Sequence, residues 1–133
     1  EAAQKGSKAS FYYLGEMAEK GDIPGGVNMK QAYQYYLIAA TYDNPMGYFK
    51  LSRYHREGFI VEKSPELEYH YMKKAAELGL VEAQHNLGVM YLEGKLVKYN
   101  GLKAIAWFSH AGAGGFAHSQ YNAAKMYLEG SKD

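Results

Sequence analysis

The stretch AQHNLGVMYLEGKLVKYNGLKAIAWFSHAGAGG, residues 83–115, determines the fold that we expect for the whole chain. Small and apolar residues recur at helical spacing in each half: Ala83, Leu87, Gly88 and Tyr91, then Ala104, Trp107, Phe108, Ala111 and Gly112. Residues three and four apart share one face of a helix, and a glycine after the last turn supplies a left-handed cap. Gly94 and Gly114–Gly115 stand at these positions, so the stretch is predicted to fold as helix, turn, helix.

The same pattern returns along the chain at intervals of about 36 residues. A forward shift of 119 − 83 = 36 places Ser119, Ala123, Tyr127 and Gly130 in register with Ala83, Leu87, Tyr91 and Gly94. A backward shift of 36 gives Leu51, Gly58, Tyr71, Ala75, Ala76 and Gly79. Short polar residues at Asn28, Ser64 and Asn100 (64 − 28 = 36, 100 − 64 = 36) can each cap a second helix by accepting a backbone N–H hydrogen bond. The chain is therefore predicted to be one helical hairpin repeated.

We divide the chain into a partial repeat at 1–8, full repeats at about 10–45, 46–81 and 82–117, and a half repeat at 118–133. Ala2–Lys5 is predicted to be the last turn of a second helix, with Gly6 in the position of Gly79. Since this register begins and stops within a hairpin, we expect a segment of a longer array whose ends expose apolar surface. Self-association through those ends is an alternative.

The second helices are expected to bury one aromatic column, Tyr35, Tyr71 and Trp107, between the two helices of each unit. Leu67, Met72, Ala75 and Ala76 are predicted to face inward in the second unit, and Tyr91 in the third. On this prediction Trp107→Ala would cost about 3–5 kcal/mol, as truncation of a buried aromatic does.

Composition restricts the function. The 133 residues suffice for one domain, and a net charge of +1 gives no electrostatic basis for binding nucleic acid or an anionic membrane. No apolar run approaches the roughly 20 residues that span a bilayer. The chain has no cysteine, which excludes a disulfide, a thiol nucleophile and a cysteine zinc site. No cofactor is predicted.

Catalytic and metal-binding patterns are weak. No two of the five histidines have i, i+4 spacing, and Glu66 with His70 would supply only two metal ligands. Gly112–Gly115 lacks the preceding strand and the Gly-Lys-Ser/Thr ending of a phosphate loop, so we interpret it as a turn between units. Serines 52, 109 and 119 have no recognisable base and acid arrangement.

These residues resemble the Sel-1-like repeat family, a relative of the tetratricopeptide repeat. The family pattern is roughly A-x-x-x-L-G-x-x-Y-x-x-G-x-x-V-x-x-D-x-x-K-A-x-x-W-Y-x-x-A-A-x-x-G. It is matched by Ala83, Leu87, Gly88, Tyr91, Gly94, Val97, Lys103, Ala104, Trp107, Ala111 and Gly115. The resemblance implies an all-α fold, a right-handed α-solenoid of stacked hairpins. It also implies a protein–protein interaction scaffold or adaptor, not an enzyme. A structural subunit of a large assembly and, less favoured, a hydrolase of the β-lactamase-like repeat type remain as alternatives.

The resemblance places the first helices of such solenoids on the concave surface, where we expect a protein or peptide partner to bind. One column of rings lies two positions after the opening small residue of each unit: Tyr12, Phe49, His85 and Tyr121. A second column lies one helical turn further: Glu16, Arg53, Val89 and Lys125. Rings could anchor a peptide and charges could orient it. The open alternative is that the rings are buried against the first helix of the next unit.

Overall fold

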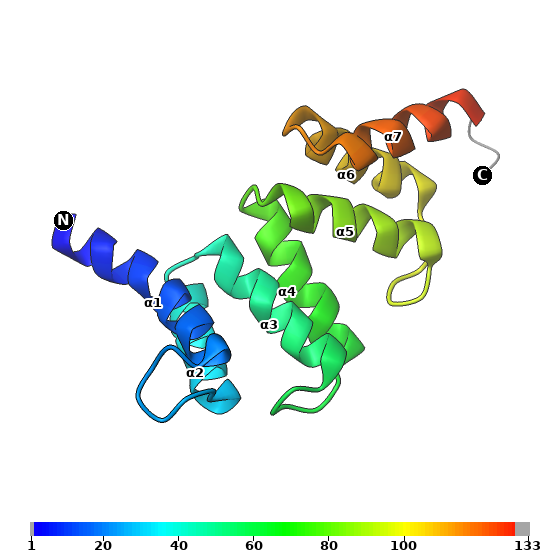
Figure 1. Cartoon of the computed structure of the whole chain (residues 1–133). Helices are drawn as coiled ribbons and strands as arrows, with labels where there is room; N and C mark the ends of the chain where they lie inside the picture. Colours follow the sequence, from blue (N-terminus) through cyan, green and yellow to red (C-terminus); the bar gives the residue numbers. More distant parts are fainter. Residues whose placement is uncertain (1, 130–133) are drawn as a thin grey trace.

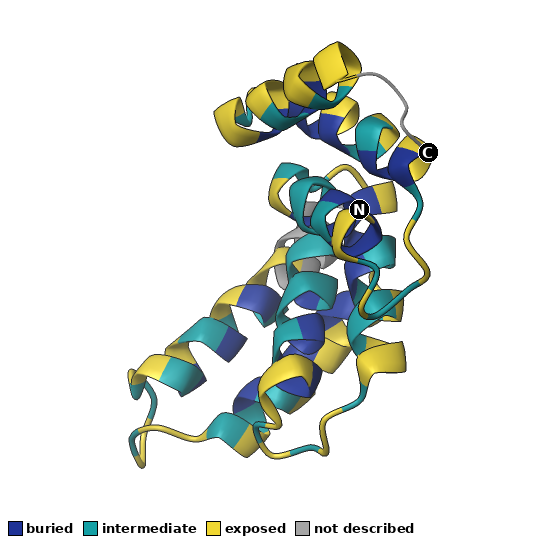
Figure 2. Ribbon diagram, turned by 90° about the vertical axis from the view of Figure 1, so that its right-hand side faces the viewer, coloured by how far each residue is buried: buried dark blue, intermediate teal, exposed yellow. Residues whose placement is uncertain are grey.

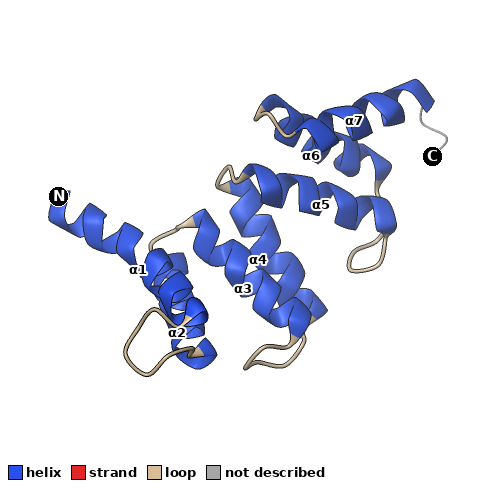
Figure 3. Cartoon of the chain, viewed as in Figure 1, coloured by secondary structure: helices blue, strands red, loops and turns tan. Residues whose placement is uncertain are grey.

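The computed structural model describes the backbone of residues 2–129 and the side chains of residues 9–129, and this part of the chain is built from helices (Figures 1 and 3). The helices are α1 (Ala2–Lys20), α2 (Met29–Thr41), α3 (Pro45–Glu57), α4 (Pro65–Glu77), α5 (Val81–Glu93), α6 (Gly101–Ala113) and α7 (Ala117–Glu129). Each helix packs chiefly on the helix before it and the helix after it. With α1 and α7 at opposite ends of the array, the predicted α-solenoid is confirmed (Figure 1).

The predicted caps of the second helices are confirmed. The side chains of Asn28, Ser64 and Asn100 accept hydrogen bonds from the backbone N–H of the residue three positions on, at 2.9, 3.2 and 3.0 Å. Each bond satisfies one of the N–H groups that a helix start leaves without an intrahelical partner. The short polar residues in this column thus fix where α2, α4 and α6 begin.

The first helix differs from the prediction. Ala2–Lys5 was expected to end a separate helix at Gly6, but α1 is one helix of 19 residues. After α4 and α6 an apolar residue follows the glycine, and Leu80 and Phe116 donate their N–H groups to the carbonyls of Ala75 and Ala111. Such helix ends commonly carry an apolar contact from this residue. After α2 the corresponding residues are Asp43 and Asn44; Asn44 donates to the carbonyl of Ala39 and is followed by Pro45. Ser7 stands there in the first unit and is followed by Lys8, so both the apolar contact and the proline are missing. The predicted cap at Gly130 lies outside the described residues.

The buried column of the second helices lies one position later than predicted. Tyr36 and Phe108 are fully buried and Met72 nearly so, whereas Tyr35, Tyr71 and Trp107 are only half-buried. Two adjacent aromatics lie about 100° apart on a helix, and periodicity alone could not decide which one faces the core. Leu67, also predicted to face inward, is exposed, whereas Tyr91, Ala75 and Ala76 are buried as predicted.

The core forms two clusters along the solenoid, and buried residues mark the facing sides of neighbouring helices (Figure 2). One cluster joins α1, α2 and α3 and includes Tyr36, Leu51 and Tyr54. The other joins α4 to α7 and includes Leu87 and Phe108. Tyr48 on α3 packs against both clusters.

A group of hydroxyls and charges ties α1 to α3 at the edge of the first cluster. The buried Tyr54 donates its hydroxyl hydrogen to Oε2 of Glu19 at 2.6 Å, and Nζ of Lys50 lies 3.7 Å from Oε1 of the same carboxylate. Burial and then the Glu19 carboxylate raise the pKa of the Tyr36 hydroxyl. No described atom is in hydrogen-bonding geometry with that hydroxyl.

This difference between two neighbouring hydroxyls gives a prediction. Tyr54→Phe should cost about 1.5–3 kcal/mol of unfolding free energy, because it removes a hydrogen bond to a charged group. Tyr36→Phe should leave the unfolding free energy unchanged or raise it, because it removes a buried hydroxyl that has no partner. Urea unfolding followed by circular dichroism measures both. Equal losses in the two variants would contradict the assignment.

Candidate functional site

The first of the predicted binding rings is buried. Tyr12 is 8% exposed and belongs to the first core cluster. Its hydroxyl donates to Oε2 of Glu16 at 2.8 Å, so the first members of the two predicted columns contact each other. Burial, reinforced by the Glu16 carboxylate, raises the pKa of Tyr12. In the first unit, therefore, the Tyr12 ring packs in the core and is not free to bind a partner.

His85 is half-buried at the contact between two units. Its Nδ1 lies 2.6 Å from Oγ of Ser119, and its ring centroid lies 4.7 Å from that of Phe116 and 5.5 Å from that of Phe108. Burial, with a smaller effect of the neighbouring His118, lowers the pKa of His85. Ser119 is the opening small residue of the next unit. The His85 ring therefore packs against the first helix of the next unit, as in the alternative to a binding role.

The His85–Ser119 pair was missed by sequence reasoning, which found no base for Ser119. The signal lay in the repeat, since the ring of one unit and the opening residue of the next are 119 − 85 = 34 apart. A serine next to a histidine can indicate a nucleophile and its base. Ser119, however, is fully buried, and no Asp or Glu of the described residues hydrogen-bonds the histidine. The geometry is that of a structural contact between units.

The two remaining rings of the column differ in how far they are buried. Phe49 is half-buried and packs against the second cluster, whereas Tyr121 is 66% exposed. Within the described residues no unit follows α7, so nothing there covers Tyr121. The degree of burial therefore reflects whether a following unit is present.

The second predicted column is more accessible. Arg53 is half-buried, with its guanidinium carbon 5.7 Å from the ring centroid of Phe59, and Lys125 is exposed. Val89 is half-buried at the edge of a cavity between α3, α4 and α5. The structure thus does not gather the eight predicted residues into one site, and one of them borders a hollow.

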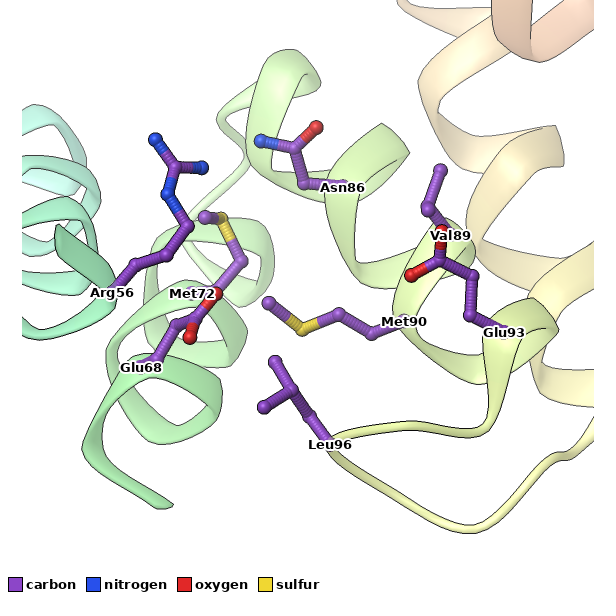
Figure 4. A pocket seen from close by; sticks show the side chains of 8 residues that line it. All are labelled: Arg56, Glu68, Met72, Asn86, Val89, Met90, Glu93 and Leu96. Carbon is purple, nitrogen blue, oxygen red and sulfur yellow. The ribbon is translucent and has the colours of Figure 1, made fainter. Parts of the chain in front are cut away.

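This cavity has a volume of about 230 Å³ and is open to solvent. Figure 4 shows its lining: Arg56 from α3; Glu68 and Met72 from α4; Asn86, Val89, Met90 and Glu93 from α5; and Leu96 from the loop after α5. Met72, Met90 and Leu96 form an apolar floor, and the charged and amide groups surround it. An apolar surface with a few polar groups around it is typical of a binding pocket.

Of the charged side chains around the cavity, Arg56 forms an ion pair and Glu68 does not. Nε of Arg56 lies 3.1 Å from Oε2 of Glu57, and both side chains of this pair are about half-exposed. Glu68 is half-buried, and its side-chain carboxylate forms no hydrogen bond or ion pair with a described residue, although its backbone carbonyl accepts a hydrogen bond from Ser52. Burial raises the pKa of Glu68; Arg56 opposes this effect and Glu57 adds to it. A carboxylate is thus held at the cavity wall without a partner.

The lining of this cavity includes positions that depart from the repeat pattern. Glu68 stands where the other units have the fully buried Ala32 and Ala104, and Met72 stands where they have Tyr36 and Phe108. Met90 takes the position of the buried Tyr54. Flexible methionines replace rings, and a carboxylate replaces a methyl group. These departures are the sequence signal of the cavity, and positions that match the repeat pattern do not carry it.

The described residues contain no group of three His, Cys, Asp or Glu side chains placed to hold a metal ion. None of the helices between residues 2 and 129 has the length and hydropathy that crossing a membrane requires.

Comparisons with known proteins identify the family. The Sel1 repeat model matches residues 11–41, 45–80, 81–116 and 117–133, so the chain belongs to the Sel1 repeat family, whose members are generally protein–protein interaction modules and typically not enzymes. Chitin synthase regulatory factor 2 of Schizosaccharomyces pombe is 28% identical over 101 residues, which are 75% of this chain. The chain spans only 20% of the length of that relative.

Solved structures share the fold. A Sel1 repeat protein from Oxalobacter formigenes superposes with a TM-score of 0.84 at 24% identity, covering 93% of this chain and 92% of the other. The protective antigen c5321 of uropathogenic Escherichia coli, described as displaying an SLR fold, gives 0.81 at 29% identity, covering 97% and 27%. Cysteine rich protein B of Helicobacter pylori gives 0.70 at 22% identity, covering 89% and 90%.

Proposed function

We propose that this chain is an adaptor that binds an extended segment of a partner protein along the first helices α3 and α5, across the cavity between them. The observation that carries the proposal is the cavity itself, an apolar floor ringed by polar groups. The half-exposed Arg53 and Val89 lie along the same two helices. Phe49 and His85 support the surface by packing between units, whereas Tyr121 and Lys125 would extend it onto α7.

An adaptor role is consistent with one of the relatives. The S. pombe relative is named chitin synthase regulatory factor 2, and a regulatory factor fits such a role. A serine hydrolase is disfavoured because Ser119, the serine that lies beside a histidine, is fully buried. We therefore place the activity of this chain in binding.

The proposal is tested by selecting peptides from a random peptide library displayed on phage against the wild-type protein. Asn86→Trp places an indole at the cavity and should abolish binding of the selected peptides. The matched control is Gln34→Trp, which introduces the same ring on α2 in a hollow lined only by polar side chains of that helix and its cap. Melting temperatures of both variants should equal that of the wild type.

Two results would contradict the proposed function. One is failure of the wild-type protein to select any peptide. The other is a set of selected peptides that bind Asn86→Trp as tightly as Gln34→Trp, because those peptides would then occupy a surface other than the cavity.

A further inference from the structure

The cavity between α3, α4 and α5 has the size of a single side chain. Its volume of about 230 Å³ is below the roughly 300–1,000 Å³ of pockets that hold drug-sized ligands. The floor of Met72, Met90 and Leu96 presents flexible apolar surface, and methionines adapt to the shape of an aliphatic chain. An occupant should therefore have a slender apolar stem.

The charge around this floor is negative. The lining carries the carboxylates of Glu68 and Glu93 and the guanidinium of Arg56, and Arg56 is paired with Glu57 outside the lining. Neither Glu68 nor Glu93 forms an ion pair with a side chain of residues 9–129. Two carboxylates thus remain to be neutralised, while the only cation of the lining already has a partner.

We propose that the cavity binds the side chain of a lysine or arginine from the partner protein. Its methylene stem lies on Met72 and Met90, and its cation contacts the carboxylates of Glu68 and Glu93. This inference rests on the proposed function, since it names the residue by which the partner segment is anchored. Long basic side chains commonly combine an apolar stem on a hydrophobic surface with a charged end at polar groups.

Other side chains fit the cavity less well. An acidic side chain would meet Glu68 and Glu93 and be repelled. An aliphatic or aromatic side chain would cover the Glu68 carboxylate further without pairing it, and burying an unpaired charge is costly. A basic side chain satisfies the floor and the carboxylates together.

The repeat itself provides the test variant. Alanine occupies the position of Glu68 in the units before and after, as Ala32 and Ala104, and is fully buried in both. Glu68→Ala therefore introduces the residue that this position of the fold accommodates elsewhere, and we expect it to fold with an unchanged or raised melting temperature. Glu82→Ala, at an exposed carboxylate near the start of α5, is the matched control for loss of one negative charge.

The probes are the Nα-acetyl methylamides of lysine, arginine, norleucine and glutamate, titrated into protein labelled with ¹³C in its methionine methyl groups. Met72 and Met90 report on the cavity, whereas Met17, Met29, Met46 and Met126 lie outside its lining. The lysine and arginine derivatives should shift the Met72 and Met90 methyl signals saturably. The norleucine derivative, which has the stem without the cation, should bind about ten-fold more weakly, as should the lysine derivative to Glu68→Ala.

Three results would overturn the inference: no shift of Met72 and Met90 with any basic derivative, equal affinity for the lysine and norleucine derivatives, or unchanged affinity in Glu68→Ala. The phage selection separates this failure from failure of the proposed function. Selected peptides that lose binding to Asn86→Trp but tolerate replacement of every basic residue would retain the function and reject the basic anchor. If the basic derivatives bind in the cavity but no peptide is selected, the basic side-chain site is retained and the proposed function is rejected.

Discussion

Phe108→Ala is expected to lower the unfolding free energy by about 3–5 kcal/mol, because it empties the position of a large, fully buried side chain. Phe108 packs across α5, close to Gly88, and its ring centroid lies 5.5 Å from that of His85. Each unit contacts only its neighbours along the array, so distant residues cannot fill the space that the missing Phe108 ring would leave. Urea unfolding followed by circular dichroism measures the loss.

Trp107→Ala is the matched comparison. The sequence predicted the large loss for this residue, but its ring is half-buried and lies 5.6 Å from that of His110, which is exposed. We now expect Trp107→Ala to cost clearly less than Phe108→Ala. An equal or larger loss in Trp107→Ala would show that the column of Tyr35, Tyr71 and Trp107 forms the core after all.

Gly88→Ser is the second substitution with a large expected effect. A Cβ atom at Gly88 would lie 2.8 Å from Cδ1 of Phe108, well inside van der Waals contact. Overpacking of this kind costs roughly 1–3 kcal/mol. The second unit carries Ser52 at the equivalent position, fully buried, with its hydroxyl donating to the carbonyl oxygen of Glu68 at 2.7 Å. Serine is therefore acceptable to the backbone, and the ring of Phe108 is what excludes it.

A double-mutant cycle checks this reason. The second unit combines Ser52 with Met72, whereas the third combines Gly88 with Phe108. The double variant Gly88→Ser with Phe108→Met reproduces the second unit's pair in the third unit. It should lose at least about 1 kcal/mol less than the sum of the single losses. Additive losses would mean that the serine is excluded by something other than the ring.

Much of this fold could be predicted because the signals are local. Asn28, Ser64 and Asn100 cap helices through hydrogen bonds that span three residues, and Gly58 and Gly94 end helices in the left-handed conformation. Such interactions depend on few neighbours and recur with the repeat. Periodicity then placed small residues such as Ala75 and Ala111 in the core.

The candidate site could not be predicted in the same way, because it depends on contacts between units. Whether His85 or Tyr121 is buried depends on the unit that follows, which the residue's own unit does not specify. The cavity is lined at positions where the residues depart from the pattern, at Glu68 and Met72, and periodicity does not reveal such departures. The eight predicted partner-binding residues therefore remain a proposal, now centred on Arg53 and Val89.

The packing of the helices has a mechanical consequence. The two helices of each hairpin pack more extensively on each other than on the neighbouring hairpin, so bending of the array should concentrate between hairpins, as where α4 meets α5. The cavity spans this place, with Arg56 on α3 and Glu93 on α5 at its two sides. A partner segment bound across the cavity would contact the helices on both sides of this place and stiffen the array. Its affinity would in turn vary with the curvature that the solenoid adopts.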